Sequence, residues 1–484
     1  MRKETTRSAR RLFAGAALLL GPLALIAGAD GAAAAATLDS APTGTDFGDV
    51  RVGDLIADPG HKVVFTNNSG APVTIGSITN VGGQSRDFAG ITGLKPDSSD
   101  VDPPSDCLKQ PDGVTPRTLA NGESCTVYVL AYPTGVGSRV TTLTVRDPAD
   151  ATLATVPLKA VGTVGYYVAG AFGEVQEFGD ATSYGDATGL PLNASIVDIK
   201  QVPFGEGFYL LGLDGGVFNY GPDADFHGST GGMQLNAPVV SIDSVDSEGY
   251  YLAASDGGVF NYGPDAPFHG SMGGKALNAP VVSIAADPAH DGYWLAATDG
   301  GVFAFGQAGF FKSMGGKHLN SPIVAIIPTP TGMGYFLVAE DGGVFAFGDA
   351  VFSGSRGGQP LTASVVDAAI SPTGLGYWML TLDGGVSAFG PDAPNLGNPD
   401  NIKVTTGITG TGSPTDVNGL GEGGFYVSWN DQTTTAAAQS AAVHAAGARQ
   451  ARAASASKPA TLRDKAVVLR TAALRTAALH TAAR

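Results

Sequence analysis

Residues 255–274 read SDGGVFNYGPDAPFHGSMGG, and residues 213–232, forty-two positions earlier, read LDGGVFNYGPDADFHGSTGG. The phrase returns with variation along the chain. The valine after its glycines recurs six times, in steps of 42 or 43 residues, at Val175, Val217, Val259, Val302, Val344 and Val386. A period of this length is typical of stacked or circular structural units.

Each repeat consists of short β-branched and aromatic runs separated by turn-forming residues. The copy that begins at residue 280 has four such runs: 280–288, 292–298, 301–306 and 309–313. Asp299-Gly300-Gly301 supplies a tight turn between the second and third runs, because glycine tolerates positive φ. No repeat contains a helical period over ten residues. Four short strands per repeat therefore predict one blade of a β-propeller.

The number of blades follows from counting the runs that would line the centre of the ring. Six of them begin at Ile196, Val239, Val281, Ile323, Val365 and Ile402. The first repeat has no such run before Gly165, whereas residues 401–410 supply one that no other repeat uses. Joining the two predicts a six-bladed ring over residues 164–432. The phrase GFYVSW at 424–429 leaves a seven-bladed ring as the alternative.

Adjacent aromatic residues in the second run of each repeat are expected to pack between neighbouring blades, since a blade cannot bury both of its faces alone. These pairs include Tyr250-Tyr251, Tyr293-Trp294 and Tyr335-Phe336. Their regular strand positions favour a core role over a ligand-binding cage.

Residues 37–163 are also predicted to be all-β. The runs HKVVFTNN, VTIGSITNV, SCTVYVLAY and RVTTLTVRD alternate like strands and are separated by turn formers such as Asn121-Gly122. Strands at this spacing fit a two-sheet sandwich. The ordered phrases FGDVRVGD, VVFTNNSGAPVTI and LANGESCTVYVLAYPTGVG resemble the immunoglobulin-like domain called ASH or choice-of-anchor D. The resemblance implies a role in interaction or scaffolding, and a surface loop over 91–118.

The first 36 residues are typical of an export signal. A basic start with Arg7, Arg10 and Arg11 precedes the uncharged stretch from Leu12 to Ala29, and small residues end at Ala36. A retained membrane anchor is the alternative, because 18 uncharged residues approach the length of a membrane span. Cleavage predicts a secreted protein, outside the cell or associated with the cell wall.

Charge divides the chain into regions of opposite sign. The leader carries +3 and the tail 433–484 carries +7, so the segment 37–432 carries −26. An acidic body of this size repels phosphate backbones, which excludes nucleic acid as its partner. The tail is rich in Ala and Thr and repeats every five residues, a spacing that forms no helical apolar face, so we expect it to be disordered.

Cys107 and Cys125 are the two cysteines of the chain. Export favours a disulfide between them, which the resemblance to the ASH domain also implies, and two buried free thiols are the alternative. No His lies near them and they form no C-x-x-C motif, so we expect neither catalysis nor metal binding from them.

Few other residues are candidates for a functional site. We predict no catalytic, cofactor-binding or metal-binding set, since no nucleophile-elbow, zinc-protease or P-loop motif occurs. His227 and His269 share one repeat position but are replaced by Phe311 and Ser353 in later copies, so we interpret them as surface residues. The Asp of each D-G-G phrase is interpreted as a turn residue.

One recurring polar position is a candidate for ligand contact. It lies in the loop that enters the inner run of each repeat, and its members are Asn193, Asn236, Asn278 and Asn320. A propeller places this loop and the D-G-G turn on one face, near the mouth of the channel, where polar groups converge on ligands. The alternative is that each Asn shapes the turn before the strand.

The repeats are similar to tandem units written GYWLVASDGGVFAFGDA, which are common in secreted actinobacterial proteins and often follow a hydrolase domain. Here the predicted sandwich takes the place of that domain. We therefore expect an exported, non-catalytic binding or scaffold protein with no cofactor, whose partner is an envelope glycan or protein. A hydrolase with a site at the channel mouth and a purely structural spacer are the alternatives.

Overall fold

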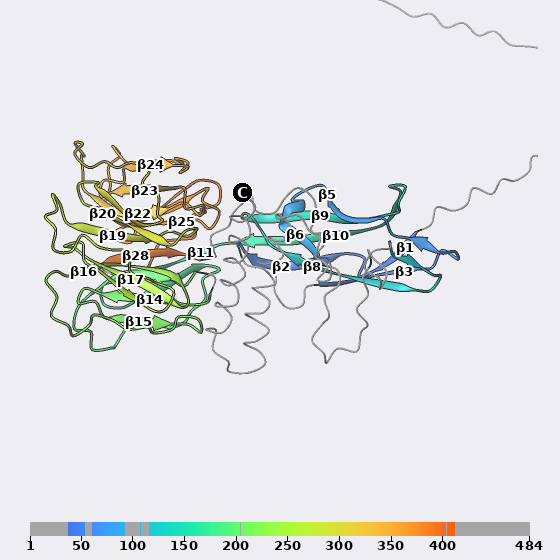
Figure 1. The fold of residues 1–484 in the computed structure, drawn as a ribbon, viewed down its shortest axis with the longest axis horizontal. Helices are drawn as coiled ribbons and strands as arrows, with labels where there is room; N and C mark the ends of the chain where they lie inside the picture. The colour runs from blue at the N-terminus through green and yellow to red at the C-terminus, as the bar shows by residue number, and fades with distance from the viewer. Residues whose placement is uncertain are drawn as a thin grey trace, which may run out of the picture. The chain divides into compact units, whose positions relative to one another are not determined.

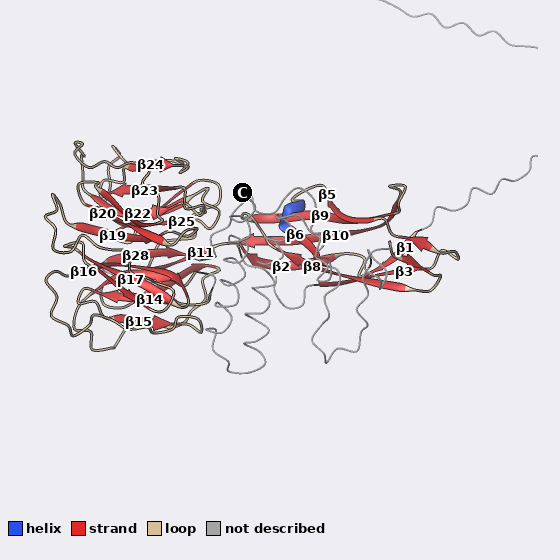
Figure 2. Ribbon diagram, in the orientation of Figure 1, coloured by secondary structure: helices blue, strands red, loops and turns tan. Residues whose placement is uncertain are grey.

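The computed structural model of the protein describes residues 37–53, 61–91, 107, 116–203, 205–402 and 404–411. Within them the fold is all-β, with no α-helix and one short 3-10 helix, η1 (Ser85–Asp87) (Figure 2). The leader 1–36, most of the predicted loop 91–118, the phrase at 424–429 and the tail 433–484 lie outside the described residues.

The N-terminal part contains two four-stranded sheets that share one core, and a small two-stranded sheet described below (Figure 1). The first sheet has the order β1 (Leu38–Ala41), β3 (His61–Asn67), β8 (Ser124–Ala131), β6 (Phe88–Ile91). The second has the order β2 (Thr45–Arg51), β10 (Thr152–Thr163), β9 (Gly137–Arg146), β5 (Ser77–Val81). Phe65 and Val127 of the first sheet and Leu143 and Val156 of the second are fully buried in that core. Alternation along each strand therefore turns one face of each sheet inward.

The run VTIGSITNV forms two strands where the sequence predicts one. β4 (Val73–Thr74) pairs with β7 (Thr118–Leu119), whereas β5 pairs with β9. Gly76 lies between β4 and β5 and donates its N–H to Arg146 O at 2.8 Å. A Cβ at Gly76 would lie 2.6 Å from the backbone of Asp147, so only glycine allows this approach.

The structure joins Cys107 and Cys125 in a disulfide within this core, with the Cα atoms 5.1 Å apart and both residues fully buried. The double substitution Cys107→Ser with Cys125→Ser should lower the free energy of unfolding by about 3 kcal/mol, because the bond constrains the unfolded chain. Urea unfolding of the two proteins measures the difference. Two thiols that react with alkylating agent in the denatured but unreduced chain would contradict the bond itself.

The C-terminal part consists of six three-stranded sheets, which we call units 1 to 6 (Figure 1). Each unit has an inner, a middle and an outer strand. The inner strands are β28 (Thr405–Gly410), β13 (Ile196–Gln201), β16 (Val239–Asp246), β19 (Val281–Ala286), β22 (Ile323–Pro328) and β25 (Val365–Ile370), in units 1 to 6 respectively. The middle strands are β11 (Gly165–Gly170), β14 (Phe208–Gly212), β17 (Gly249–Ala254), β20 (Gly292–Ala297), β23 (Gly334–Ala339) and β26 (Tyr377–Thr381). The outer strands are β12 (Val175–Gly179), β15 (Val217–Tyr220), β18 (Val259–Tyr262), β21 (Val302–Gly306), β24 (Val344–Gly348) and β27 (Val386–Phe389).

The inner strands form a closed cycle of neighbours. Each contacts the inner strand of the next unit, and β28 contacts both β13 and β25. β28 also pairs with β11, so a strand from the end of the repeat region completes the first unit. We call this assembly the six-sheet ring. The predicted use of the run at 401–410 is thus confirmed, although β28 begins at Thr405 instead of Ile402.

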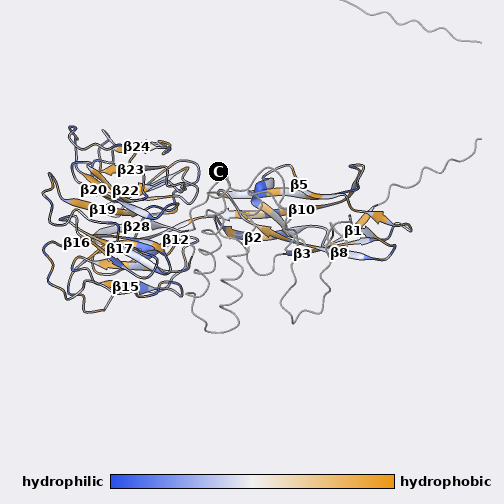
Figure 3. Ribbon diagram, viewed as in Figure 1, coloured by the Kyte–Doolittle hydropathy of each residue, from blue (hydrophilic) through white to orange (hydrophobic). Residues whose placement is uncertain are grey.

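Aromatic residues fill every junction between units. The middle strands are buried on both faces. The middle strand β20 and the inner strands β19 and β22 carry the hydrophobic colour in Figure 3. Consecutive residues point to opposite faces, so Tyr250 packs on unit 2 and Tyr251 on unit 4. One aromatic pair occupies each of the six junctions, with ring centroids 4.6–5.6 Å apart: Tyr167–Phe208, Tyr209–Tyr250, Tyr251–Tyr293, Trp294–Tyr335, Phe336–Tyr377 and Trp378–Tyr166.

The predicted fourth strand of each unit is wrong. Residues 309–313 and their equivalents form an irregular outer segment. Each contains a residue with a left-handed backbone, such as Gly270 (φ 119°) or Lys312 (φ 102°), and this conformation interrupts a strand. The segment is held instead by side chains of the next unit, as described below.

The two parts of the chain contact each other. Val52 is fully buried in one cluster with Val164 and Tyr166 of the ring. The guanidinium of Arg51 donates a hydrogen bond to Asp180 O at 3.0 Å. The described residues from Thr37 to Thr411 accordingly belong to one unit.

Candidate functional site

A cavity of about 160 Å³ lies among the inner strands of the ring. It is lined by the second halves of all six inner strands and by the turns that follow several of them. Its polar lining includes six side chains that we call the axial cluster: Asp198 and Lys200 of β13, Ser241 and Asp243 of β16, Ser283 of β19 and Asp367 of β25. Four of these six side chains are ionisable.

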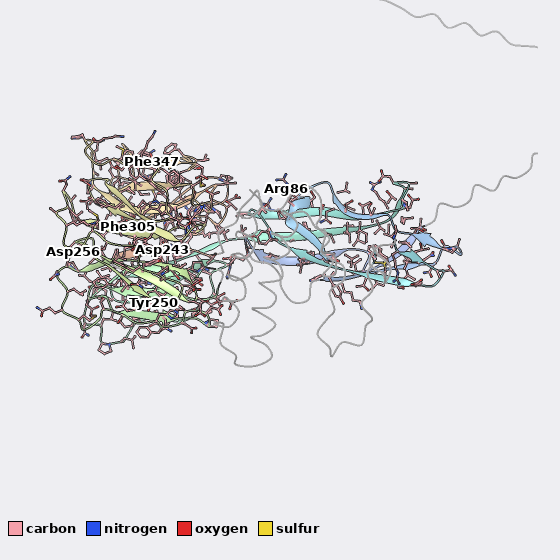
Figure 4. All side chains as sticks on the ribbon, viewed as in Figure 1. Arg86, Asp243, Tyr250, Asp256, Phe305 and Phe347 are labelled. Atoms are coloured by element: carbon pink, nitrogen blue, oxygen red, sulfur yellow. A yellow bond between two sulfur atoms is a disulfide. The ribbon has the colours of Figure 1, made fainter. Side chains whose placement is uncertain are left out.

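An ion pair lies at the centre of the axial cluster. Lys200 Nζ is 2.8 Å from Asp243 Oδ1, and the Asp243 side chain is 5% exposed. Figure 4 labels Asp243 among the strands of the ring. Asp243 also accepts hydrogen bonds from the backbone N–H groups of Ser244 and Ala286, each at 2.8 Å. A buried carboxylate with three donors of this kind is fully compensated.

Side chains of the cluster connect neighbouring inner strands. In four inner strands, β13, β16, β19 and β25, the side chain of the third residue accepts a hydrogen bond from a backbone N–H of the next inner strand in the ring. The bonds run from Ile242 N to Asp198 (2.9 Å), Ile284 N to Ser241 (3.3 Å), Ile326 N to Ser283 (3.3 Å) and Ile408 N to Asp367 (2.9 Å). Ala325 has this position in β22 and cannot accept such a bond. Inner strands of adjacent units do not pair through their backbones, so these side chains satisfy amides that would otherwise lack a partner.

Burial changes the protonation of two of these carboxyls. It raises the pKa of Asp198 to about 6, although hydrogen bonds and Lys200 favour the charged form. Burial and the nearby charge of Asp198 raise the pKa of Asp367 to about 8. Burial alone would lower the pKa of Lys200, but Asp243, Asp198 and Asp367 together raise it. The cluster therefore combines a charged pair with a carboxyl that retains its proton at neutral pH.

The ring should become less stable as pH rises from about 4 to about 8. Both carboxyls have a folded pKa above the ordinary aspartate value of 3.8, so the unfolded chain releases these protons at lower pH than the folded chain. Their contribution is complete below that ordinary value and is lost as pH passes through the folded pKa values. We expect a lower Tm at pH 8.5 than at pH 5, and Asp367→Asn should remove most of the difference.

Thermal melts at the two pH values test this expectation. Asp256→Asn is the matched control, because Asp256 lies in a D-G-G turn at the edge of the sheets (Figure 4). The control should keep the full difference in Tm. An Asp367→Asn variant that also keeps it would show that another group is responsible.

The predicted asparagines do not line this cavity. Asn193, Asn236, Asn278 and Asn320 are exposed and precede the inner strands, whereas the cavity is lined by the later halves of those strands. They therefore lie at the opposite end of the inner strands, beside the D-G-G turns as expected. In those turns the Asp side chain accepts the N–H two residues on, for example Gly258 N to Asp256 at 2.9 Å, which agrees with the predicted turn role.

The two histidines, which the sequence analysis interprets as surface residues, are half-buried at junctions between units. His227 Nε2 is 2.9 Å from Ser247 O, and His269 Nε2 is 2.8 Å from Asp291 Oδ1. Both contacts reach the turn of the following unit. Their neighbours explain why Phe311 serves equally well at this position: it packs against Tyr335 of the next unit.

No cluster of three or more His, Cys, Asp or Glu residues suited to a metal ion occurs in the described segments. Nor does any helix in that part of the chain have the length and apolar character needed to cross a bilayer.

Comparison with known proteins gives no functional assignment. No family model matches the chain, and no curated protein matches it. Among solved structures, the chain is similar to a structural genomics protein of unknown function from Bacteroides thetaiotaomicron, at 11% identity and a TM-score of 0.37. That alignment covers 73% of this chain and 83% of the other.

Proposed function

We propose that this chain is an exported, non-catalytic binding or scaffold protein that acts at the cell envelope or outside the cell. In this proposal residues 37–163 are an immunoglobulin-like sandwich of the ASH type, and the six-sheet ring is a six-bladed β-propeller. Two sheets around one core support the first assignment, and the closed cycle of inner strands supports the second. Both architectures commonly present binding surfaces.

The observation that carries the proposal is the bonding of the axial cluster. Asp198, Asp243 and Asp367 each accept two backbone N–H groups, one from the following residue of the same strand and one from the next inner strand. Carboxyl groups used in this way hold the ring together. A structural role at the axis leaves the outer surfaces of the ring and of the sandwich for a partner.

Cell fractionation and binding assays with the full chain test the proposal. We expect the chain in the envelope or culture fraction, and we expect it to sediment with isolated envelope material from its own cells. A chain that stays in the cytoplasm, or that is exported but binds neither envelope material nor a secreted protein, would overturn it.

One observation favours a second candidate, a hydrolase with its site at the ring axis. A carboxyl with a pKa of about 8 next to one of about 6 is an arrangement that suits a general acid and a general base. This candidate predicts hydrolysis of ester or glycoside substrates by the full chain, lost in Asp367→Asn and Asp198→Asn. Equal turnover by wild type and both variants would reject the axial site as its origin.

A further inference from the structure

Four phenylalanines of the ring stand at the same repeat position and are exposed to solvent. Each lies in an outer segment, two residues before the residue with the left-handed backbone. They follow one another at intervals of 42 residues in units 2 to 5, with exposed fractions of 55–60%: Phe226, Phe268, Phe310 and Phe352. We call them the phenylalanine row.

The row is constant where its neighbours in sequence vary. The residue after each phenylalanine is His227, His269, Phe311 or Ser353, and the residue before it is equally variable. Core positions of a repeat stay constant because packing requires it. More than half of each of these side chains is in water, so packing does not account for their constancy.

The backbone beside each phenylalanine is held by a buried tyrosine of the next unit. Tyr250 OH donates to Gly228 O at 2.6 Å and accepts from His227 N at 3.2 Å. Tyr293 and Tyr335 make the same two bonds in the following units, and Tyr377 does so with Gly354 O and Ser353 N. The rings are therefore presented on a fixed backbone, which reduces the entropy lost on binding.

The row stops at the two units that contact the N-terminal part. The equivalent residues are Ser183 in unit 1 and Asn395 in unit 6, both polar and exposed. These units contact Arg51 and Val136, through Asp180 and Asp392. At this repeat position the exposed aromatic side chain is thus restricted to units 2 to 5, whose outer segments have no such neighbour among the described residues.

We propose that the phenylalanine row binds a neutral polysaccharide, with sugar rings stacked on the phenylalanine side chains. The inference rests on the proposed binding function and names its partner. The negative face of an aromatic ring attracts the C–H face of a sugar ring. A single stacked ring binds weakly, so four equivalent rings suit a partner that repeats its own chemistry and engages several of them.

Charge decides which repeating polymer fits. Residues 165–411 contain 24 Asp and Glu against six Lys and Arg, so an anionic polymer is repelled. The row itself offers no cluster of cations for phosphate or sulfate groups. A neutral polymer avoids this repulsion and needs only the apolar contact that the rings provide.

Sedimentation of the full chain with insoluble chitin and cellulose, and affinity electrophoresis in gels that contain soluble mannan or β-glucan, test the proposal. We expect binding to at least one of these neutral polymers. Phe→Ser at one position, which copies Ser183 of unit 1, should weaken binding about three- to tenfold. The substitution at all four positions should weaken it at least about 100-fold. The matched control replaces four other exposed apolar side chains by serine: Leu190, Met233, Met333 and Leu375.

The quadruple variant should melt like wild type, because its side chains are exposed, and the control should bind like wild type. Equal binding by wild type and quadruple variant would overturn the role of the row while leaving a binding function intact. Failure of wild type to bind any neutral polymer would also overturn it. Loss of vesicle binding or of self-association in the quadruple variant, without an effect on polysaccharide, would assign the row to a membrane or to a second copy and reject the proposal.

Discussion

A chain that ends after Asp400 should lose the stability of the whole six-sheet ring. The truncation removes β28, which pairs with β11 from Tyr166↔Gly410 to Gly170↔Thr405. It also removes the bond from Ile408 N to Asp367 (2.9 Å) and the bond from Gln201 N to Thr409 Oγ1 (3.2 Å). Unit 1 then loses its inner strand, and the faces of units 6 and 2 that β28 covers are exposed to water.

We expect this truncation to lower the free energy of unfolding by about 5 kcal/mol or more, a large part of the total for a typical domain. Ile408, Thr405 and Thr409 are buried in the intact ring, and the strand edges that β28 covers would be left unpaired. Thermal melts and limited proteolysis of the truncated and full chains measure the effect. The loss should extend to units 3 and 4, far from the cut, because each unit is buried by its neighbours.

Truncation after Gln432 is the matched control. It removes only the basic segment 433–484, whose five-residue repeat has no periodic apolar face. That protein should melt within a few degrees of the full chain. If the chain that ends at Asp400 also melts like the full chain, β28 does not close the ring and the propeller proposal fails.

The repeat made much of the ring predictable. The outer strands begin at the six valines of the repeated phrase, and five of the six inner strands begin at the predicted residue. Strand starts are predictable here because β-branched runs follow fixed turn residues, and six copies repeat the same signal. The packing of adjacent aromatic residues between neighbouring units was also predictable, because alternation in a strand directs consecutive side chains to opposite faces of the sheet.

The outer segment and the axial cluster were not predictable in the same way. GFFKS has strand-like composition, yet Lys312 adopts a left-handed backbone that composition does not reveal. Asp198, Asp243 and Asp367 each interrupt an inner run that begins with two β-branched apolar residues, and this break in the pattern was the available signal. The asparagines lie beside the D-G-G turns as expected, but the cavity is lined by the other ends of the inner strands, and the sequence pattern does not show at which end of the strands a cavity forms.

Trp378→Ala should open the ring at its closing junction. Trp378 is fully buried, its ring centroid lies 5.4 Å from that of Tyr166, and Nε1 donates to Pro394 O at 2.8 Å. This junction joins unit 6 to unit 1, which are connected in sequence only through the rest of the ring and through β28. Removing a buried tryptophan side chain costs about 3–5 kcal/mol.

Trp294→Ala is the matched control, because Trp294 is equally buried, pairs with Tyr335 at 5.6 Å and donates to Gly309 O at 2.7 Å. Both variants should lose a similar free energy of unfolding, but they should differ in where the ring opens. Units 4 and 5 are consecutive in sequence and remain joined by a short connection when their junction loosens. Hydrogen exchange should therefore show β11 and β28 losing protection first in Trp378→Ala, well before the remaining strands, whereas Trp294→Ala should loosen β20 and β23 together with the ring as a whole. The same exchange pattern in both variants would mean that the closing junction is no weaker than the others, and that β28 binds unit 1 as firmly as a continuous chain would.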